Sequence, residues 1–583
     1  MELYDLSNFS PIARGMFALA IALYVPGWLA VRHFRLCELQ LVGALFVNPI
    51  VLYVLVSIFW LVGINPSTKT DIILISLVGV IICSLLVKRP KLTFEVTTFQ
   101  VVYSVLGFTA VVLVFSQGVF DIWRLDLFGS DGVHSWNRWA QIWSTGSFPD
   151  RSYGYPQLIP TVWSVPYWFM GPEGQYYARL IHLSLIILPL ISSGMVLAKH
   201  KPIGASLALA VYCVLILLIS NGWLGSTLSA GFVDWTAATF VLAGLLLIAT
   251  YLENSTPVIK VELWIFSVLV FVAAFLMKSI TFVYLVFIFA AFSLGVFKKN
   301  LTSLFAVAVL CVIFLMIYAF QQSNVVNTSL PPFKNDQGVV WYFENMYMQF
   351  DRAYRFFPLV PVVLLASLVW LALNGKRLLV LVALTVVGLG MWSIAAAYDI
   401  RAALPFIHPI VCLAACLVGV KLDQSWSIGS WGAAVQRHSY ISLGIAMLFI
   451  ALLWLPIWRD DKEQYKYFSH DELNSYGISS VNNHIFELIK DRNCDVHTSE
   501  FYMSAINIFK MKTNIFARFI GTDENFINIF NRSKLNKNCK IVVHKYKKSN
   551  VIVPNFLEKN SDYILSKRVF GTWSSHIVVV MLK

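Results

Sequence analysis

Residues 262–297 read ELWIFSVLVFVAAFLMKSITFVYLVFIFAAFSLGVF, and their two charged residues are Glu262, at the beginning, and Lys278, in the middle. The apolar runs on either side of Lys278, 262–277 and 280–297, approach the length of about 20 residues that a helix needs to cross a bilayer. A charged side chain is costly at membrane depth, so Lys278 is expected where the chain turns between two spans. This stretch predicts a polytopic helical membrane protein.

Similar apolar runs recur in both directions from this stretch, and the loops between several of them are very short. The length rule predicts an all-α membrane protein of about fourteen transmembrane helices. The expected spans are residues 12–31, 38–63, 71–87, 99–116, 175–197, 203–221, 230–251, 262–277, 280–297, 301–320, 356–374, 377–396, 404–421 and 440–457.

The composition supports this class. Of the 583 residues, 58% are hydrophobic and 13% charged, against about 45–50% and about 25% in soluble domains. The charges gather in the tail, where residues 459–583 carry 19 Lys or Arg and 13 Asp or Glu. The net charge of +13 does not indicate nucleic-acid binding, because many of the basic residues lie in short loops where membrane orientation explains them.

Orientation follows from the loops that carry those basic residues, which alternate along the chain. They contain Arg32/Arg35, Lys88/Arg89/Lys91, Lys199/Lys201, Lys260, Lys298/Lys299, Lys376/Arg377 and Lys421/Arg437. The positive-inside rule places these loops in the cytoplasm. Both termini and the long loops 117–174 and 321–355 are then expected outside, which in a Gram-negative cell is the periplasm. The expected location is the cytoplasmic (inner) membrane.

The first long outer loop contains FDIWRLDLFGSDGVHSWNRWAQIWSTGSFPDRSYGYPQLIPTVWSVPYWFMG, Phe120–Gly171. A helix opened by Asp131 would have one polar and one aromatic face, as a helix in the membrane interface needs. The polar face would hold Asp131, His134, Ser135 and Arg138, and the other Trp136, Trp139, Ala140 and Trp143. The tryptophans are read as interface anchors ahead of sugar platforms, and Asp131 as a helix cap or a functional carboxylate.

Further polar residues are expected at the same outer face. The stretch Tyr155–Met170 reads as a second interfacial or re-entrant helix because three prolines interrupt it. Asp234 lies at the outer start of one span, Lys278 at the outer end of another, and Asp399 and Arg401 in a turn before a third. Each alone could be a snorkelling side chain, but their convergence on one face predicts a shared polar site.

The tail reads as a small α/β domain. Short apolar runs at 539–544, 551–553 and 576–580 predict strands, and Val481–Asp491 predicts a helix. Cys494 and Cys539 either pair as a disulfide, in an oxidising compartment, or stay free. The expected organisation is 1–98 as N-terminal transmembrane helices, 99–457 as a transmembrane core and 458–583 as the extracytoplasmic domain.

In their order and sidedness these features resemble the GT-C superfamily of membrane glycosyltransferases. The matching segments are Ser130–Ala140, Tyr155–Pro160, Gly231–Asp234, the Lys278 junction and Tyr398–Arg401 before Pro405. The order resembles the dolichyl-phosphate-mannose-protein mannosyltransferase-like branch and its bacterial relatives, and the resemblance covers about residues 99–421. The resemblance implies transfer of a sugar from a polyprenyl-phosphate donor to an envelope polysaccharide, lipid or protein.

Each charged residue has an expected role in such a reaction. Asp131 would act as general base and Asp234 would orient the acceptor or neighbouring groups. Lys278 and Arg401 would receive the lipid phosphate. Additional substrate-binding candidates are His134, Arg138, Tyr155 and Asp399. No cofactor is firmly indicated, although Asp131 and Asp234 could share a divalent cation.

Two other classes of membrane protein compete with this interpretation. A transporter or flippase of lipid-linked saccharides would place charges near the middle of its spans, in matched halves, whereas here they lie at the outer ends. An O-antigen polymerase or ligase would place its large outer loop late in the chain, whereas the richest loop here comes early.

Overall fold

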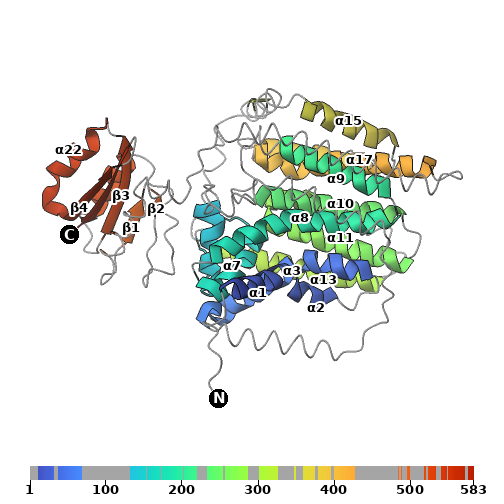
Figure 1. Cartoon of the computed structure of the whole chain (residues 1–583), viewed down its shortest axis with the longest axis horizontal. Coiled ribbons are helices and arrows are strands. Elements are labelled where there is room, and N and C mark those ends of the chain that lie inside the picture. Colours follow the sequence, from blue (N-terminus) through green and yellow to red (C-terminus); the bar gives the residue numbers. More distant parts are fainter. Residues whose placement is uncertain are drawn as a thin grey trace, which may run out of the picture.

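The computed structural model describes a helical bundle and a small C-terminal α/β domain (Figure 1). The described residues are 11–31, 37–68, 132–150, 152, 154–171, 174–200, 202–218, 233–253, 257–286, 301–325, 344, 347–348, 359–374, 379–395, 400–426, 484, 488, 495–498, 518–519, 523–533, 540–547, 549–571 and 575–582. The predicted spans 71–87, 99–116 and 440–457 lie outside them.

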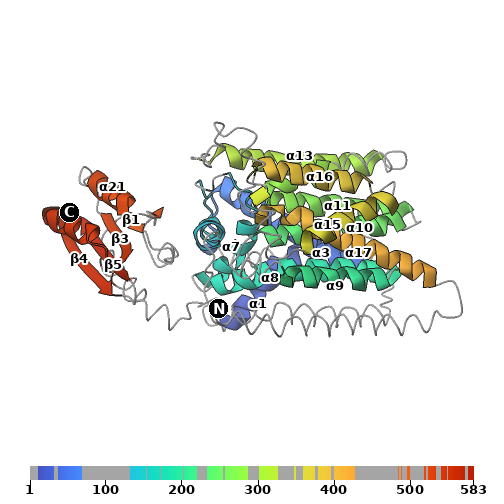
Figure 2. The same ribbon diagram turned by 90° about the horizontal axis from the view of Figure 1, so that it is seen from above.

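The bundle consists of long helices that run side by side (Figures 1 and 2). They coincide with the predicted spans to within a few residues, and by length and composition four helical stretches of the described chain could cross a membrane. The chain is thus a multi-pass membrane protein. Its long helices are α3 (Cys37–Val62), α8 (Gly174–His200), α9 (Pro202–Leu218), α10 (Val233–Glu253), α11 (Pro257–Met277), α13 (Leu301–Ser323), α15 (Leu359–Asn374), α16 (Leu379–Ala395) and α17 (Leu404–Trp426).

The first predicted span is broken into α1 (Pro11–Leu23) and α2 (Val25–Val31). Pro26 follows the break and has no amide hydrogen to continue the helix. The side-chain amide of Asn48, on α3, donates to the carbonyl oxygens of Ile21 and Ala22 at 3.0 and 2.6 Å. Its oxygen accepts from the Gly27 amide at 2.7 Å. One buried side chain therefore satisfies the backbone groups that the break leaves open.

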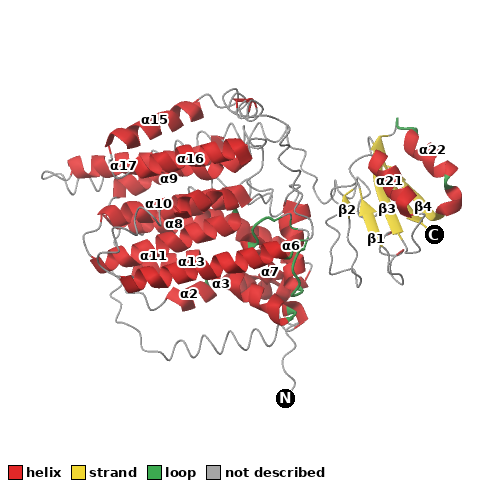
Figure 3. Cartoon of the chain, turned by 180° about the vertical axis from the view of Figure 1, so that it is seen from behind, coloured by secondary structure: helices red, strands yellow, loops and turns green. Residues whose placement is uncertain are grey.

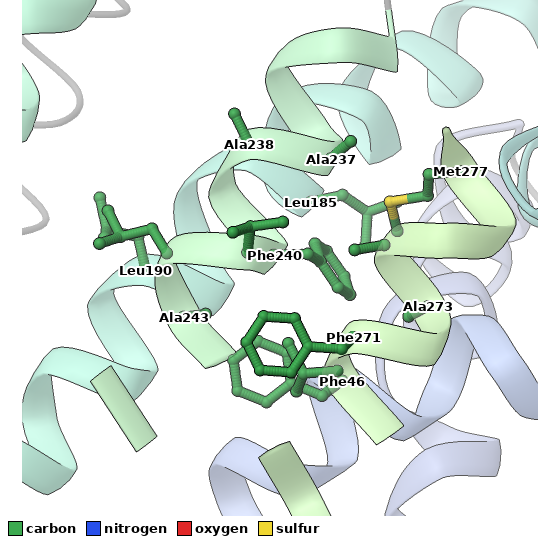
Figure 4. Packing of buried hydrophobic residues seen from close by; sticks show 14 of the residues in the cluster. Phe46, Leu185, Leu190, Ala237, Ala238, Phe240, Ala243, Phe271, Ala273 and Met277 are labelled. Carbon is green, nitrogen blue, oxygen red and sulfur yellow. The ribbon is translucent and has the colours of Figure 1, made fainter. Parts of the chain in front are cut away.

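Small residues let α10 pack closely on its neighbours. Ala237 and Ala243 of α10 are fully buried beside larger rings such as Phe240 and Phe271 (Figure 4). A Cβ atom on Gly244 would lie 2.6 Å from the Phe271 ring, so this helix contact needs glycine. Small residues bring membrane helices together because packing, rather than water exclusion, drives their association.

Three short helices lie across one end of the bundle, which we call the capped end (Figure 3). They are η3 (Gly132–Asn137), α6 (Arg138–Ser144) and α7 (Leu158–Met170). The Tyr167 hydroxyl donates to the Asn137 side chain, and the Trp143 indole donates to Gln157 Oε1 at 3.1 Å. These bonds join α7 and the turn before it to the η3–α6 segment, and the predicted pair of short helices is confirmed.

The tail contains a five-stranded sheet in the order β2-β1-β3-β5-β4. Strands β1 (Asp495–Thr498) and β2 (Arg518–Phe519) run parallel to β3 (Lys540–Lys547), whereas β5 (Ser575–Leu582) runs antiparallel to β3 and to β4 (Ile564–Gly571). Helices α21 (Asp523–Ser533) and α22 (Ile552–Lys559) pack on one face through Phe526 and Leu557. The α/β prediction is therefore confirmed.

One predicted strand of the tail is wrong. Residues 551–553 lie at the start of α22, because the Asn550 side chain accepts the Ile552 amide at 2.8 Å and so begins a helix. Val553 and Leu557 then bury themselves one turn apart, which is helical spacing. The other two predictions correspond to β3 and β5, and His484 and Leu488 in the predicted helix are helical.

Candidate active site at the capped end

The centre of the site is an ion pair between Asp234 and Lys278. Lys278 Nζ lies 2.8 Å from Asp234 Oδ1, with the carboxylate side chain 6% exposed and the lysine 20% exposed. Asp234 stands in the first turn of α10 and Lys278 directly follows the last residue of α11. Helix dipoles favour an anion at an N-terminus and a cation at a C-terminus. Both charges therefore occupy the helix ends that favour them.

A local break in the chain positions the lysine. Lys278 has extended backbone angles, φ −145° and ψ 112°, between α11 and the short helix η6 (Ser279–Thr281). Its carbonyl oxygen accepts from the Thr281 amide at 3.0 Å and from the Thr281 hydroxyl at 2.9 Å. The break thus has its own hydrogen bonds and directs the lysine toward α10 instead of continuing the helix.

Arg401 adds a second cation. It lies in the 3-10 turn η7 (Ile400–Ala403), half-buried, immediately before α17. Its positive charge and that of Lys278 both act on the Asp234 carboxylate. Three predicted site residues from three separate segments are therefore brought together, and their formal charges sum to +1.

Aromatic rings form one wall of the site. The ammonium group of Lys278 lies 5.7 Å from the centre of the Tyr155 ring, within the range of a cation–π contact. Trp136 and Trp139 pack against Tyr155 with ring centroids 5.6 and 6.1 Å away. Tyr155 was predicted as a substrate-binding residue, and the structure places it beside the ion pair.

The interpretation of the tryptophans as interface anchors is wrong. Trp136, Trp139 and Trp143 are 3%, 4% and 0% exposed, so all three rings are enclosed by protein. The six residues of η3 also form a π-helix, which winds more loosely than the 3.6-residue repeat on which the two-faced pattern was based. Among the described residues the two faces still differ in exposure: Ser135 and Arg138 are half-buried, whereas Trp136, Trp139, Ala140 and Trp143 are buried.

Four other residues were predicted for the site, and the structure describes two of them. Asp131 and Asp399 lie outside the described residues, so their place in the site stays a prediction. His134 belongs to η3, and half-buried Arg138 is the first residue of α6. Within the described part of the chain, no three His, Cys, Asp or Glu side chains form a group that could hold a metal ion.

Two histidines near the site were not predicted. His408 on α17 is fully buried, and its ring packs against that of Trp235, the neighbour of Asp234, at 5.0 Å. His182 on α8 lies 3.4 Å from the hydroxyl of Thr236, also on α10. Both histidines lie inside apolar helices, where an ionisable residue is itself a sign of function. The sequence-based prediction considered such residues only at the ends of spans.

Comparisons with known proteins give a structural similarity alone. No family model and no curated protein sequence matches the chain. A crystal structure of ArnT from Cupriavidus metallidurans bound to undecaprenyl phosphate is similar over 82% of this chain and 97% of that one, with 13% identity and a TM-score of 0.49. A crystal structure of the same protein in the apo state is similar over 81% of this chain and 98% of that one, with 13% identity and a TM-score of 0.47. At these values the similarity assigns no activity to the chain.

Proposed function

We propose that this protein is a membrane glycosyltransferase of the GT-C superfamily that takes its sugar from a polyprenyl-phosphate-linked donor. The observation that carries the proposal is the cluster of Asp234, Lys278 and Arg401 at the ends of buried helices. A site that receives a phosphate leaving group needs fixed cations in a largely dehydrated setting. The sequence resemblance to this superfamily supports the same reaction.

In this reaction the acceptor hydroxyl attacks the anomeric carbon of the sugar. The acceptor loses its proton to Asp131 as general base, and the bond from the anomeric carbon to the phosphate oxygen breaks with its electron pair on that oxygen. Lys278 and Arg401 bind the lipid phosphate that is released. Asp234, which lies 2.8 Å from Lys278 Nζ, holds that cation in place.

The membrane setting of the proposal comes from the distribution of charge. The positive-inside rule puts the capped end and the tail domain on the outer side of the cytoplasmic membrane, which is the periplasmic side in a Gram-negative cell. The acceptor would then be an envelope glycan, lipid or protein that meets the donor lipid at that surface.

The test is transfer of radiolabelled sugar in proteoliposomes from a panel of polyprenyl-phosphate sugars. Wild type should release the sugar from one donor, and Asp131→Asn should lose about a hundredfold or more of the rate. Lys278→Gln should also reduce transfer. Lys421→Gln is the matched control, because Lys421 makes its own cation–π contact with Trp370 at 5.3 Å, away from the cluster.

The competing classes give different results in the same vesicles. A transporter or flippase would move the intact lipid-linked saccharide across the bilayer without breaking the bond to phosphate. A polymerase or ligase of O-antigen type would consume a lipid-linked oligosaccharide and leave the monosaccharide donors untouched. Either result would contradict the proposed reaction.

A further inference from the structure

The three charged residues of the site belong to segments that meet again deeper in the bundle. Asp234 is the second residue of α10, Lys278 directly follows α11, and Arg401 lies in the η7 turn that leads into α17. Below them, three aromatic rings lie nearly parallel, with Tyr284 in the middle. Its ring stacks on Phe271 of α11 at 5.9 Å and 14°, and on Phe406 of α17 at 5.5 Å and 16°.

A glycine lies against the ring at each end of this stack. A Cβ atom on Gly244 of α10 would lie 2.6 Å from Phe271, and one on Gly388 of α16 would lie 2.1 Å from Phe406. Each outer ring thus presses directly on the backbone of a further helix. The stack therefore links α10, α11, α17 and α16, and the first three of these carry or adjoin the charged residues.

The hydroxyl of Tyr284 closes the connection. It donates to the carbonyl oxygen of Pro405 at 3.1 Å and also hydrogen-bonds the Thr385 side chain of α16. The Pro405 carbonyl needs this donor because Pro409, four residues later inside α17, has no amide hydrogen to offer it. Pro405 comes four residues after Arg401, and Tyr284 six residues after Lys278.

We propose that Tyr284 is a positioning residue of the site, which fixes the Lys278 break and the Arg401 turn relative to each other and to Asp234. It touches none of the three charged groups and acts through the backbone segments that carry them. Without its hydroxyl, the Pro405 carbonyl is left unpaired in a dry interior, and the start of α17 is free to shift. The role in binding a lipid phosphate rests on the proposed function, whereas the positioning of the ion pair does not.

The first experiment needs no ligand. The coupling between Asp234 and Lys278 is measured by a double-mutant cycle with Asp234→Asn and Lys278→Gln, read as unfolding equilibrium constants in mixed micelles. The cycle is repeated in Tyr284→Phe and in Tyr53→Phe. Tyr53 is the matched control, because its buried hydroxyl donates to Gln321 Oε1 at 2.8 Å and joins α3 to α13, neither of which carries one of the three charged residues.

We expect a coupling of about tenfold in wild type and in Tyr53→Phe, and of only about two- to threefold in Tyr284→Phe. An equal coupling in all three backgrounds would overturn the proposal. Should Tyr284→Phe not fold, Thr385→Val takes its place in the cycle, because it removes the side-chain hydroxyl that holds the Tyr284 hydroxyl toward Pro405. Its coupling should fall below the wild-type value, and an unchanged coupling would overturn the proposal.

The second experiment measures binding of undecaprenyl phosphate to the full chain in nanodiscs. Tyr284→Phe should weaken binding about fivefold, with Tyr53→Phe close to wild type, since a displaced cation loses part of a charge-assisted contact. Absence of binding to wild type, with the coupling still lost in Tyr284→Phe, would refute the proposed donor and leave the positioning role standing. Equal binding by both tyrosine variants would overturn the extension of that role to the phosphate.

Discussion

Asp234 and Lys278 form a 2.8 Å ion pair whose two members differ in their access to water, since the carboxylate is 6% exposed and the lysine 20%. Removing one member of a buried pair leaves the other charge uncompensated, at a cost of about 3–5 kcal/mol when that charge is fully buried. Lys278→Gln removes the ion-pair partner of Asp234, which carries the more deeply buried of the two charges.

Lys278→Gln should therefore lower the free energy of unfolding more than Asp234→Asn, and the double variant should regain part of the loss. Equilibrium unfolding in mixed micelles measures all three variants. Equal losses in the two single variants would show that the pair is hydrated from both sides.

Tyr155 should matter for its ring rather than for its hydroxyl, because the Lys278 ammonium lies over the ring at 5.7 Å. A cation–π contact is worth about 0.5–2 kcal/mol. Tyr155→Phe should therefore keep the KM for the sugar donor near the wild-type value, whereas Tyr155→Leu should raise it several-fold. Steady-state transfer kinetics test this, and a large effect of Tyr155→Phe would indicate that the hydroxyl contacts the substrate.

Gly388 and Gly390 offer a paired test of packing on one helix. A Cβ atom on Gly388 would lie 2.1 Å from the Phe406 ring, whereas one on Gly390 meets nothing within 4 Å. Gly388→Ala should cost about 1–3 kcal/mol by overpacking. Gly390→Ala should be neutral or gain up to about 1 kcal/mol from helix propensity. Thermal unfolding compares the two, and similar midpoints would contradict the close contact.

The tail domain should lose stability in mild acid through His544. Burial lowers the pKa of His544 below its ordinary value of 6.5, although Asp523, whose Oδ1 is 2.5 Å from His544 Nε2, partly opposes the shift. Below pH about 6.5 the unfolded chain takes up a proton that the folded domain binds less readily, so stability falls as pH falls.

Hydrogen exchange of residues 540–547 in the full chain, followed from pH 7.5 to 5, measures this effect. Protection should decrease toward acid in wild type, and less so in His544→Gln. An unchanged slope in the variant would assign the acid sensitivity to other groups.

Cys494 and Cys539 lie outside the described residues, yet each directly precedes a strand residue whose place is known. Asp495 and Lys540 are Cα partners in the adjacent parallel strands β1 and β3. Neighbouring strands lie about 4.8 Å apart, a separation that a disulfide spans. We therefore predict a Cys494–Cys539 disulfide in protein from an oxidising compartment. Mass spectrometry of unreduced peptides tests it, and alkylation of both thiols without reductant would contradict it.

The long helices could be predicted from the sequence because a span is set by one property, its apolar length. The ion pair was within reach as well. Asp234 lies at the start of one span and Lys278 at the end of the next, so the predicted orientation of the spans was enough to place both on the same side of the membrane. Tyr155, which contacts Lys278, belongs to the loop 117–174 that was expected on that same side.

What the sequence could not predict depended on tertiary contacts or local hydrogen bonds. Trp136 and Trp139 are buried and pack on Tyr155 in the turn before α7; the periodicity of their own segment indicated an aromatic face but not what covers it. The helix at Ile552 depends on the Asn550 side chain, where the apolar run alone favoured a strand. Tyr284 read as one more apolar residue of a span, because its role depends on Pro405, which is distant in the sequence.

The tail sheet has a practical consequence for anyone who wishes to study that domain by itself. Helices α21 and α22 cover only one of its faces, yet Ile541, Val543, Val579 and Met581 on the opposite face are also buried. Helical His484, which precedes β1 in the sequence, lies near enough to β4 for the charge of Arg568 to act on its ring. A recombinant fragment should therefore begin ahead of His484. One that begins at Asp495 would expose an apolar sheet face to water and self-associate through it.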